Sequence, residues 1–146
     1  SFKKFCRLQA QSNEGGSMSN LPDNIGTLLD KVGADKSNDA WAVRPGIWAI
    51  KHKALEKVAA YLGITFDAPK IICAEILEKA VAIEVHGRLG DLTAWSIGEA
   101  ATYNNKNGYP FAMAEKRAKD RVILKLCGLH GEAYSEEEAD DFRKRA

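Results

Sequence analysis

The residues with the most chemical content lie between Gly98 and Leu129. A polar loop with three asparagines and one lysine, from Thr102 to Tyr109, leads into a sequence that is typical of a helix beginning at Pro110. That helix carries five basic side chains and only two acidic ones. Lys and Arg side chains bind nucleic-acid phosphates by displacing counterions, and aromatic side chains stack on unpaired bases. A polar loop that feeds a basic helix is therefore a candidate surface for a phosphate backbone.

The basic side chains of this helix do not all share one side. On a helical wheel Lys116 and Lys119 flank one side of the apolar stripe, whereas Arg117 and Arg121 flank the other. One strand of nucleic acid cannot easily reach all four on a single subunit. A solvated helix with pairs such as Glu115–Lys119 explains the same composition. From composition alone, both interpretations stay open.

The rest of the chain offers little catalytic chemistry. Its histidines, His52, His86 and His130, fall one per predicted element with no Cys or acidic residue at ligand spacing, so we expect no metal site. The sequence has no phosphate-binding loop, no dinucleotide signature and no G-x-S-x-G motif, so we expect no cofactor and no catalytic residues. A small enzyme built around one of the histidines is the lowest-ranked alternative.

Composition indicates one globular domain with a foreign segment in front of it. The chain has 146 residues, of which 45% are hydrophobic. Residues 1–17 end in a Gly-Gly-Ser linker, which is typical of a tag or a fused peptide, and Phe2, Phe5 and Leu8 would be its anchors for a peptide contact. Residues 18–146 form the predicted domain. Without a long apolar run or a secretory signal, we expect no membrane contact and a cytoplasmic location.

Hydrophobic periodicity predicts the elements of this domain, because apolar spacing of three and four indicates helices and strict alternation indicates strands. The links between the alternating runs have hairpin length. The predicted fold class is α+β, a three-stranded antiparallel meander with flanking helices and a β-β-β-α core. The expected order is a helix over Leu21–Val32, an extended piece over Trp41–Arg44, a helix over Ile47–Leu62 ended by Gly63, strands over Lys70–Leu77, Ala80–Arg88 and Leu92–Ala100, the basic helix from Pro110, and an acidic helix over Ser135–Phe142.

The second half of the basic helix is apolar nearly all round. Ile123 and Leu124 add to the stripe that contains Val122. Such a helix needs cover on two sides. The sheet covers one side, and we expect a neighbouring subunit to cover the other. Val122, Ile123 and Leu124 are therefore the predicted oligomer interface.

Three segments carry a resemblance to a known family. The third strand ends in the small residues of Trp95–Ala101, the helix has the Ala-, Lys- and Arg-rich sequence Ala112–Arg121, and Leu126–Leu129 reads Leu-Cys-Gly-Leu. This pattern resembles the core of the single-strand annealing proteins of homologous recombination, which include the phage Erf group and the eukaryotic annealing protein of double-strand-break repair. The resemblance spans residues 70–129, under half of the chain.

The resemblance implies a homo-oligomeric ring or filament that holds single-stranded DNA in a basic groove. A complementary strand would then anneal without nucleotide hydrolysis, in recombination or repair. The candidate DNA contacts are basic or amide side chains of the preceding helix, the loop and the basic helix: Lys51, Lys53, Asn105, Lys106, Lys116, Arg117, Lys119 and Arg121. The alternative function is an oligomeric protein-interaction module on the same scaffold that binds no nucleic acid.

Overall fold

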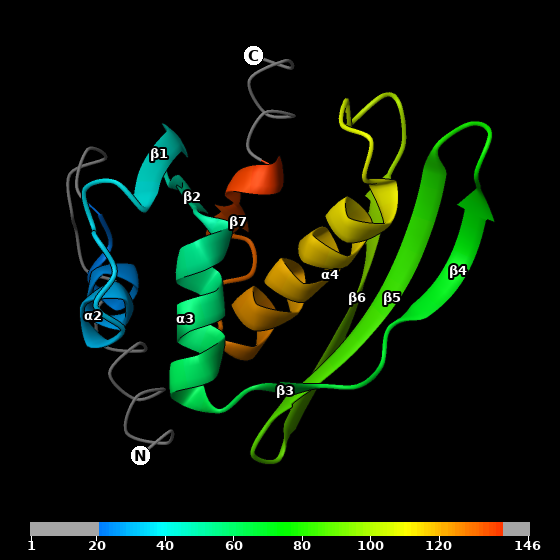
Figure 1. The fold of residues 1–146 in the computed structure, drawn as a ribbon. Coiled ribbons are helices and arrows are strands. Elements are labelled where there is room, and N and C mark those ends of the chain that lie inside the picture. Colours follow the sequence, from blue (N-terminus) through cyan, green and yellow to red (C-terminus); the bar gives the residue numbers. More distant parts are fainter. Residues whose placement is uncertain (1–20, 139–146) are drawn as a thin grey trace.

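The computed structural model describes residues 21–138, so the predicted peptide segment 1–17 lies outside the described residues. The class is mixed α+β, as predicted, with helices and two sheets. Figure 1 shows the elements in layers: α2 (Asp23–Lys31) lies beside α3 (His52–Leu62), and α4 (Pro110–Leu126) lies between α3 and the larger sheet. The basic helix is therefore at the centre of the molecule.

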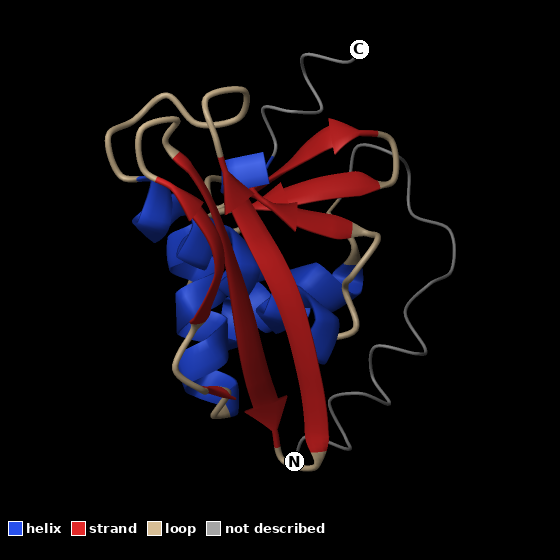
Figure 2. Ribbon diagram, turned by 90° about the vertical axis from the view of Figure 1, so that its right-hand side faces the viewer, coloured by secondary structure: helices blue, strands red, loops and turns tan. Residues whose placement is uncertain are grey.

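The larger sheet has four strands, one more than the sequence predicts. Its long central strand β5 (Ala80–Leu89) pairs antiparallel with β6 (Leu92–Ala100) along one side. Along its other side β5 pairs antiparallel with β4 (Lys70–Glu75) and with the two-residue strand β3 (Thr65–Phe66). A bulge between Ile71 and Cys73 leaves Ile72 as an extra residue in β4. Figure 2 shows that no described helix covers the outer face of this sheet.

The smaller sheet corrects the prediction of one helix over Ile47–Leu62. Residues Ile47–Ile50 form strand β2, which pairs antiparallel with β1 (Ala40–Arg44) and parallel with β7 (Ala133–Ser135). Gly46 at φ 78° turns the chain so that the apolar residues after it run back along β1. Apolar residues at positions 47, 50 and 54 match helical spacing, but the first two belong to a buried strand.

Helix α3 therefore begins five residues later than predicted, at His52. Its N-cap residue, Lys51, makes no side-chain cap. The backbone N–H of His52 instead donates to the carboxylate of Glu136 at 3.1 Å, and this acceptor is 84 positions away in the chain. The helix ends where predicted, at Gly63, which has the left-handed φ of 78°.

Helix α4 packs closely on β6 because the facing residues are small. A Cβ atom on Gly98 would lie 2.0 Å from the carbonyl oxygen of Ala114 and 2.6 Å from the backbone nitrogen of Ala118. Both alanines are fully buried. The small residues in the sequence around Gly98 therefore allow the helix to lie almost on the backbone of the strand.

The predicted oligomer interface is part of the core of a single chain, which corrects that prediction. Val122, Ile123 and Leu124 are 0%, 1% and 2% exposed. The second cover that this apolar helix requires comes from α3 and the small sheet, on the side away from the larger sheet (Figure 1). These three side chains are not available to a partner.

Candidate nucleic-acid interface

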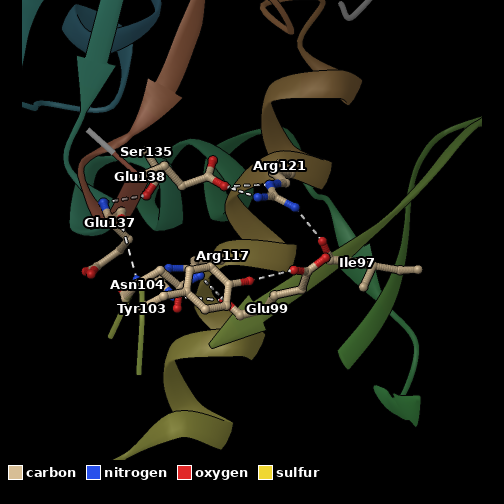
Figure 3. A network of polar contacts seen from close by, with 9 residues as sticks. All are labelled: Ile97, Glu99, Tyr103, Asn104, Arg117, Arg121, Ser135, Glu137 and Glu138. Carbon is tan, nitrogen blue, oxygen red and sulfur yellow. Dashed lines mark hydrogen bonds and ion pairs between the residues drawn. The ribbon is translucent and has the colours of Figure 1, made fainter. Parts of the chain in front are cut away.

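Arg117, a predicted DNA contact, is an internal residue. Its side chain is 4% exposed and donates to the carbonyl oxygens of Glu99 at 2.8 Å and Asn104 at 2.7 Å. A third, longer contact of 3.5 Å reaches the carbonyl oxygen of Glu137. Figure 3 shows the guanidinium between the end of β6, the loop that follows it and the C-terminal segment. The group joins these three segments and is not presented to solvent, so this prediction is corrected.

Arg121 is bound one helical turn further along α4. Its guanidinium donates to the carbonyl oxygen of Ile97 and forms an ion pair with Glu138, whose carboxylate is nearly buried (Figure 3). The hydroxyl of Ser135, at the start of the predicted acidic helix, accepts the backbone N–H of Glu137 at 3.0 Å. The rest of the predicted acidic helix lies outside the described residues.

Lys125 continues the same series. Its ammonium donates to the carbonyl oxygen of Trp95 at 2.8 Å and lies 5.6 Å from the centre of the Trp95 ring. Three cationic side chains at four-residue spacing on α4 thus bind three carbonyl groups at two-residue spacing on β6. We call this set the β6 edge ladder: Arg117, Arg121 and Lys125 with the carbonyls of Glu99, Ile97 and Trp95. It satisfies backbone acceptors along the outer edge of a strand.

The remaining predicted contacts lie at the surface but do not form one continuous row. Lys119 forms the predicted helical ion pair with Glu115 at 2.8 Å, and its ammonium lies 5.5 Å from the centre of the Phe66 ring. Lys53 lies 3.6 Å from the buried carboxylate of Asp39. Lys51, Lys106 and Lys116 form no salt bridge with any residue within 21–138. These three lysines are therefore available to form an ion pair with an external partner. Lys106 lies in the loop before α4, and Lys116 lies on α4.

The Asn-rich loop is built by its own asparagines. Asn104 accepts the backbone N–H of Ala101 at 2.8 Å, and Asn107 accepts that of Tyr109 at 2.8 Å. Asn105, a predicted contact, bonds with the backbone of Asn107 at 3.4–3.5 Å. These amides fold the loop, which is why asparagine is frequent in it.

The loop and the first turn of α4 present aromatic side chains to solvent. Tyr103 and Tyr109 are 69% and 73% exposed, and Phe111 is 39% exposed. Lys106 lies between the two tyrosines in the sequence. The helix begins at Pro110, where its dipole places partial positive charge. Aromatic rings, an unpaired lysine and a helix N-terminus are thus gathered at one end of α4, and we call residues 103–116 the loop–helix surface.

A second polar cluster joins α3 to α4. His52 Nδ1 lies 2.6 Å from Asp120, which is fully buried, and His52 Nε2 lies 3.0 Å from Glu56. The hydrogen bond to Asp120 raises the pKa of His52, with further help from the charges of Asp120 and Glu56, while burial and Lys116 act in the opposite direction. This arrangement stabilises a charged imidazole between two helices.

The comparisons with known proteins add no identity: the chain matches no protein-family model, no curated protein and no solved structure. Among residues 21–138, no helix is long and apolar enough to cross a membrane. Within the same residues, His, Cys, Asp and Glu side chains form no group of three that could hold a metal ion.

Proposed function

We propose that this chain binds single-stranded nucleic acid at the loop–helix surface. The observation that carries the proposal is the combination of exposed Tyr109 and Phe111 with two lysines that form no salt bridge within residues 21–138, Lys106 in the loop before α4 and Lys116 in the second turn of α4. Lysines bind phosphates through counterion release, and aromatic rings stack on bases that are free only in single strands. Duplex DNA offers phosphates but no free base faces, so single strands bind more tightly.

Strand annealing is the biological role proposed for this binding. Its support is the resemblance to single-strand annealing proteins, which depends on the order β4, β5, β6 and α4 and on the small residues where α4 lies on β6. Lysine contacts to the backbone hold the strand while leaving bases able to pair, and no nucleotide is consumed. In this proposal Arg117 and Arg121 do not contact DNA. They hold the loop and the end of β6 in place through their hydrogen bonds to backbone carbonyls.

The test is fluorescence anisotropy of a labelled oligo-dT strand and of a duplex of equal length, at several salt concentrations. The variant Lys106→Ala/Lys116→Ala is expected to bind more weakly, and its salt slope should fall by about 1.4, since each lost phosphate contact contributes about 0.7 for single strands. The matched control is Lys31→Ala/Lys36→Ala, which removes the same charge near α2. Equal losses in both variants, or no binding of the parent protein at low salt, would overturn the proposal.

A different observation favours the alternative of an oligomeric interaction module. Four large apolar side chains at β4 and the turn after it are more than half exposed: Ile71, Ile72, Ile76 and Leu77. They lie in residues 70–77, whereas the loop–helix surface begins at residue 103. The anisotropy experiment separates the two functions, because a pure interaction module binds neither oligonucleotide.

A further inference from the structure

The two outer edges of the larger sheet differ in how they are protected. Along β6, the outward carbonyls of Trp95, Ile97 and Glu99 accept hydrogen bonds from the β6 edge ladder. Another strand could pair there only by displacing two arginines and a lysine. No comparable cover lies along β4 among residues 21–138, since every residue of Lys70–Glu75 is exposed. One edge is closed and the other is open.

The open edge is also apolar. We call residues 68–77, with the sequence Ala-Pro-Lys-Ile-Ile-Cys-Ala-Glu-Ile-Leu, the β4 edge. Ile71 and Ile72 are 61% and 53% exposed, and Ile76 and Leu77 in the turn are 76% and 100% exposed. Unpaired backbone and exposed isoleucine together form a template for another strand, which natural proteins usually block with charge or proline. Here Pro69 lies before the strand and the two charges lie at its ends, so the four residues between Lys70 and Glu75 carry neither charge nor proline.

The sequence of this edge is complementary to itself. If two copies run antiparallel about a point between Ile72 and Cys73, Lys70 of each copy lies opposite Glu75 of the other. Within β4 the remaining pairs of this register are apolar, Ile71 with Ala74 and Ile72 with Cys73. Shifting the register by one residue in either direction moves both charges opposite apolar residues. One register therefore satisfies all six positions of β4.

We propose that two copies of this chain pair through β4, antiparallel about a two-fold axis between Ile72 and Cys73. The two larger sheets then form one continuous sheet, with two Lys70–Glu75 pairs flanking an apolar centre. The contact is isologous, because the closed edge of β6 cannot serve as the partner of β4 in a head-to-tail chain. This interface replaces the one predicted on α4, and it does not depend on nucleic-acid binding.

Sedimentation velocity over a concentration series tests this interface with two single charge reversals. Lys70→Glu gives a chain with Glu at both positions, and Glu75→Lys gives one with Lys at both, so each variant sets like charges opposite each other twice. Each should raise the dimer dissociation constant about tenfold or more. A mixture of the two variants should form a heterodimer, since both cross-strand pairs are then Glu–Lys. Lys57→Glu, on the exposed side of α3, is the matched control and should dimerise like the parent protein.

The mixture distinguishes the interface from damage to the fold. A misfolded variant would not be rescued by adding a second variant, and circular dichroism of each variant alone provides an independent check. A parent protein that stays monomeric at high concentration would overturn the proposal. So would single variants that dimerise as well as the parent, or a mixture that remains monomeric.

Discussion

Replacing Arg117 by methionine should destabilise the protein severely, although arginine on a basic helix is usually replaceable. Methionine keeps much of the aliphatic length but donates no hydrogen bond. The carbonyls of Glu99 and Asn104, now bound at 2.8 and 2.7 Å, would lose their donor at a site where Arg117 is only 4% exposed. Each unsatisfied buried acceptor costs about 1–3 kcal/mol, and relief from burying a charge offsets part of this. We expect a net loss of about 2–4 kcal/mol.

Urea unfolding followed by circular dichroism measures this loss. With a denaturant dependence of about 1.5 kcal/mol/M, the midpoint of Arg117→Met should fall by roughly 2 M. Lys125→Met is the matched control on the same ladder: its ammonium is partly exposed, so the free energy of unfolding should change by less than about 1 kcal/mol. Equal midpoints for Arg117→Met and the parent protein would refute the structural role of Arg117. Such a result would return this arginine to the candidate DNA contacts.

Two further predictions concern the packing around α4. The pKa of His52 is raised in the folded protein by its hydrogen bond to Asp120. The stability that this pairing adds is therefore fully present below the ordinary pKa of about 6.5, and it is lost as the pH rises through the pKa of the folded protein. The melting temperature should therefore fall more between pH 6 and pH 9 for the parent protein than for Asp120→Asn. Equal falls in melting temperature for the two proteins would contradict this prediction. Gly98→Ala should cost about 3 kcal/mol or more, because the new Cβ meets the backbone of Ala114, whereas Gly108→Ala, which meets nothing within 4 Å, should leave the urea midpoint nearly unchanged.

The sequence predicted those elements whose signals are local. Alternation located β5 and β6 to within one residue, Pro110 marked the start of α4, and Gly63 marked the end of α3. These signals work because a strand or helix that packs on one face must repeat its apolar residues with its own period. A proline or a left-handed glycine likewise acts on the backbone at its own position.

Elements that depend on distant partners were missed. Residues 47–50 are apolar in a pattern that fits either a helix or a buried strand, and only pairing with β1 and β7 makes them a strand. The start of α3 at His52 depends on Glu136, far along the chain. Strand β3 has two residues, too few for any periodicity to be visible. In each case the deciding contact joins segments that the sequence alone does not bring together.

In the candidate site, too, the sequence alone could not show which basic side chains bind within the protein and which face solvent. An arginine is equally basic whether it faces a phosphate or a carbonyl group, so composition could not separate Arg117 and Arg121 from Lys106 and Lys116. The signal that could have separated them is a match of two spacings. Four residues of helix advance about 6 Å, and two residues of strand advance about 6.6 Å, so cations at every fourth helical position can each meet a carbonyl on a neighbouring edge strand.

This match has a consequence for mutational studies of the basic helix. Cations at positions 117, 121 and 125 belong to the β6 edge ladder, so substitutions there alter stability first and binding only through the fold. Lys116 lies outside this series, and its substitution should alter binding with little change in stability. Reversing both arginines to glutamate would place two acids against backbone carbonyls and should unfold the protein. A loss of DNA binding in that variant would therefore not locate a DNA contact, whereas the same loss in a stable Lys116 variant would.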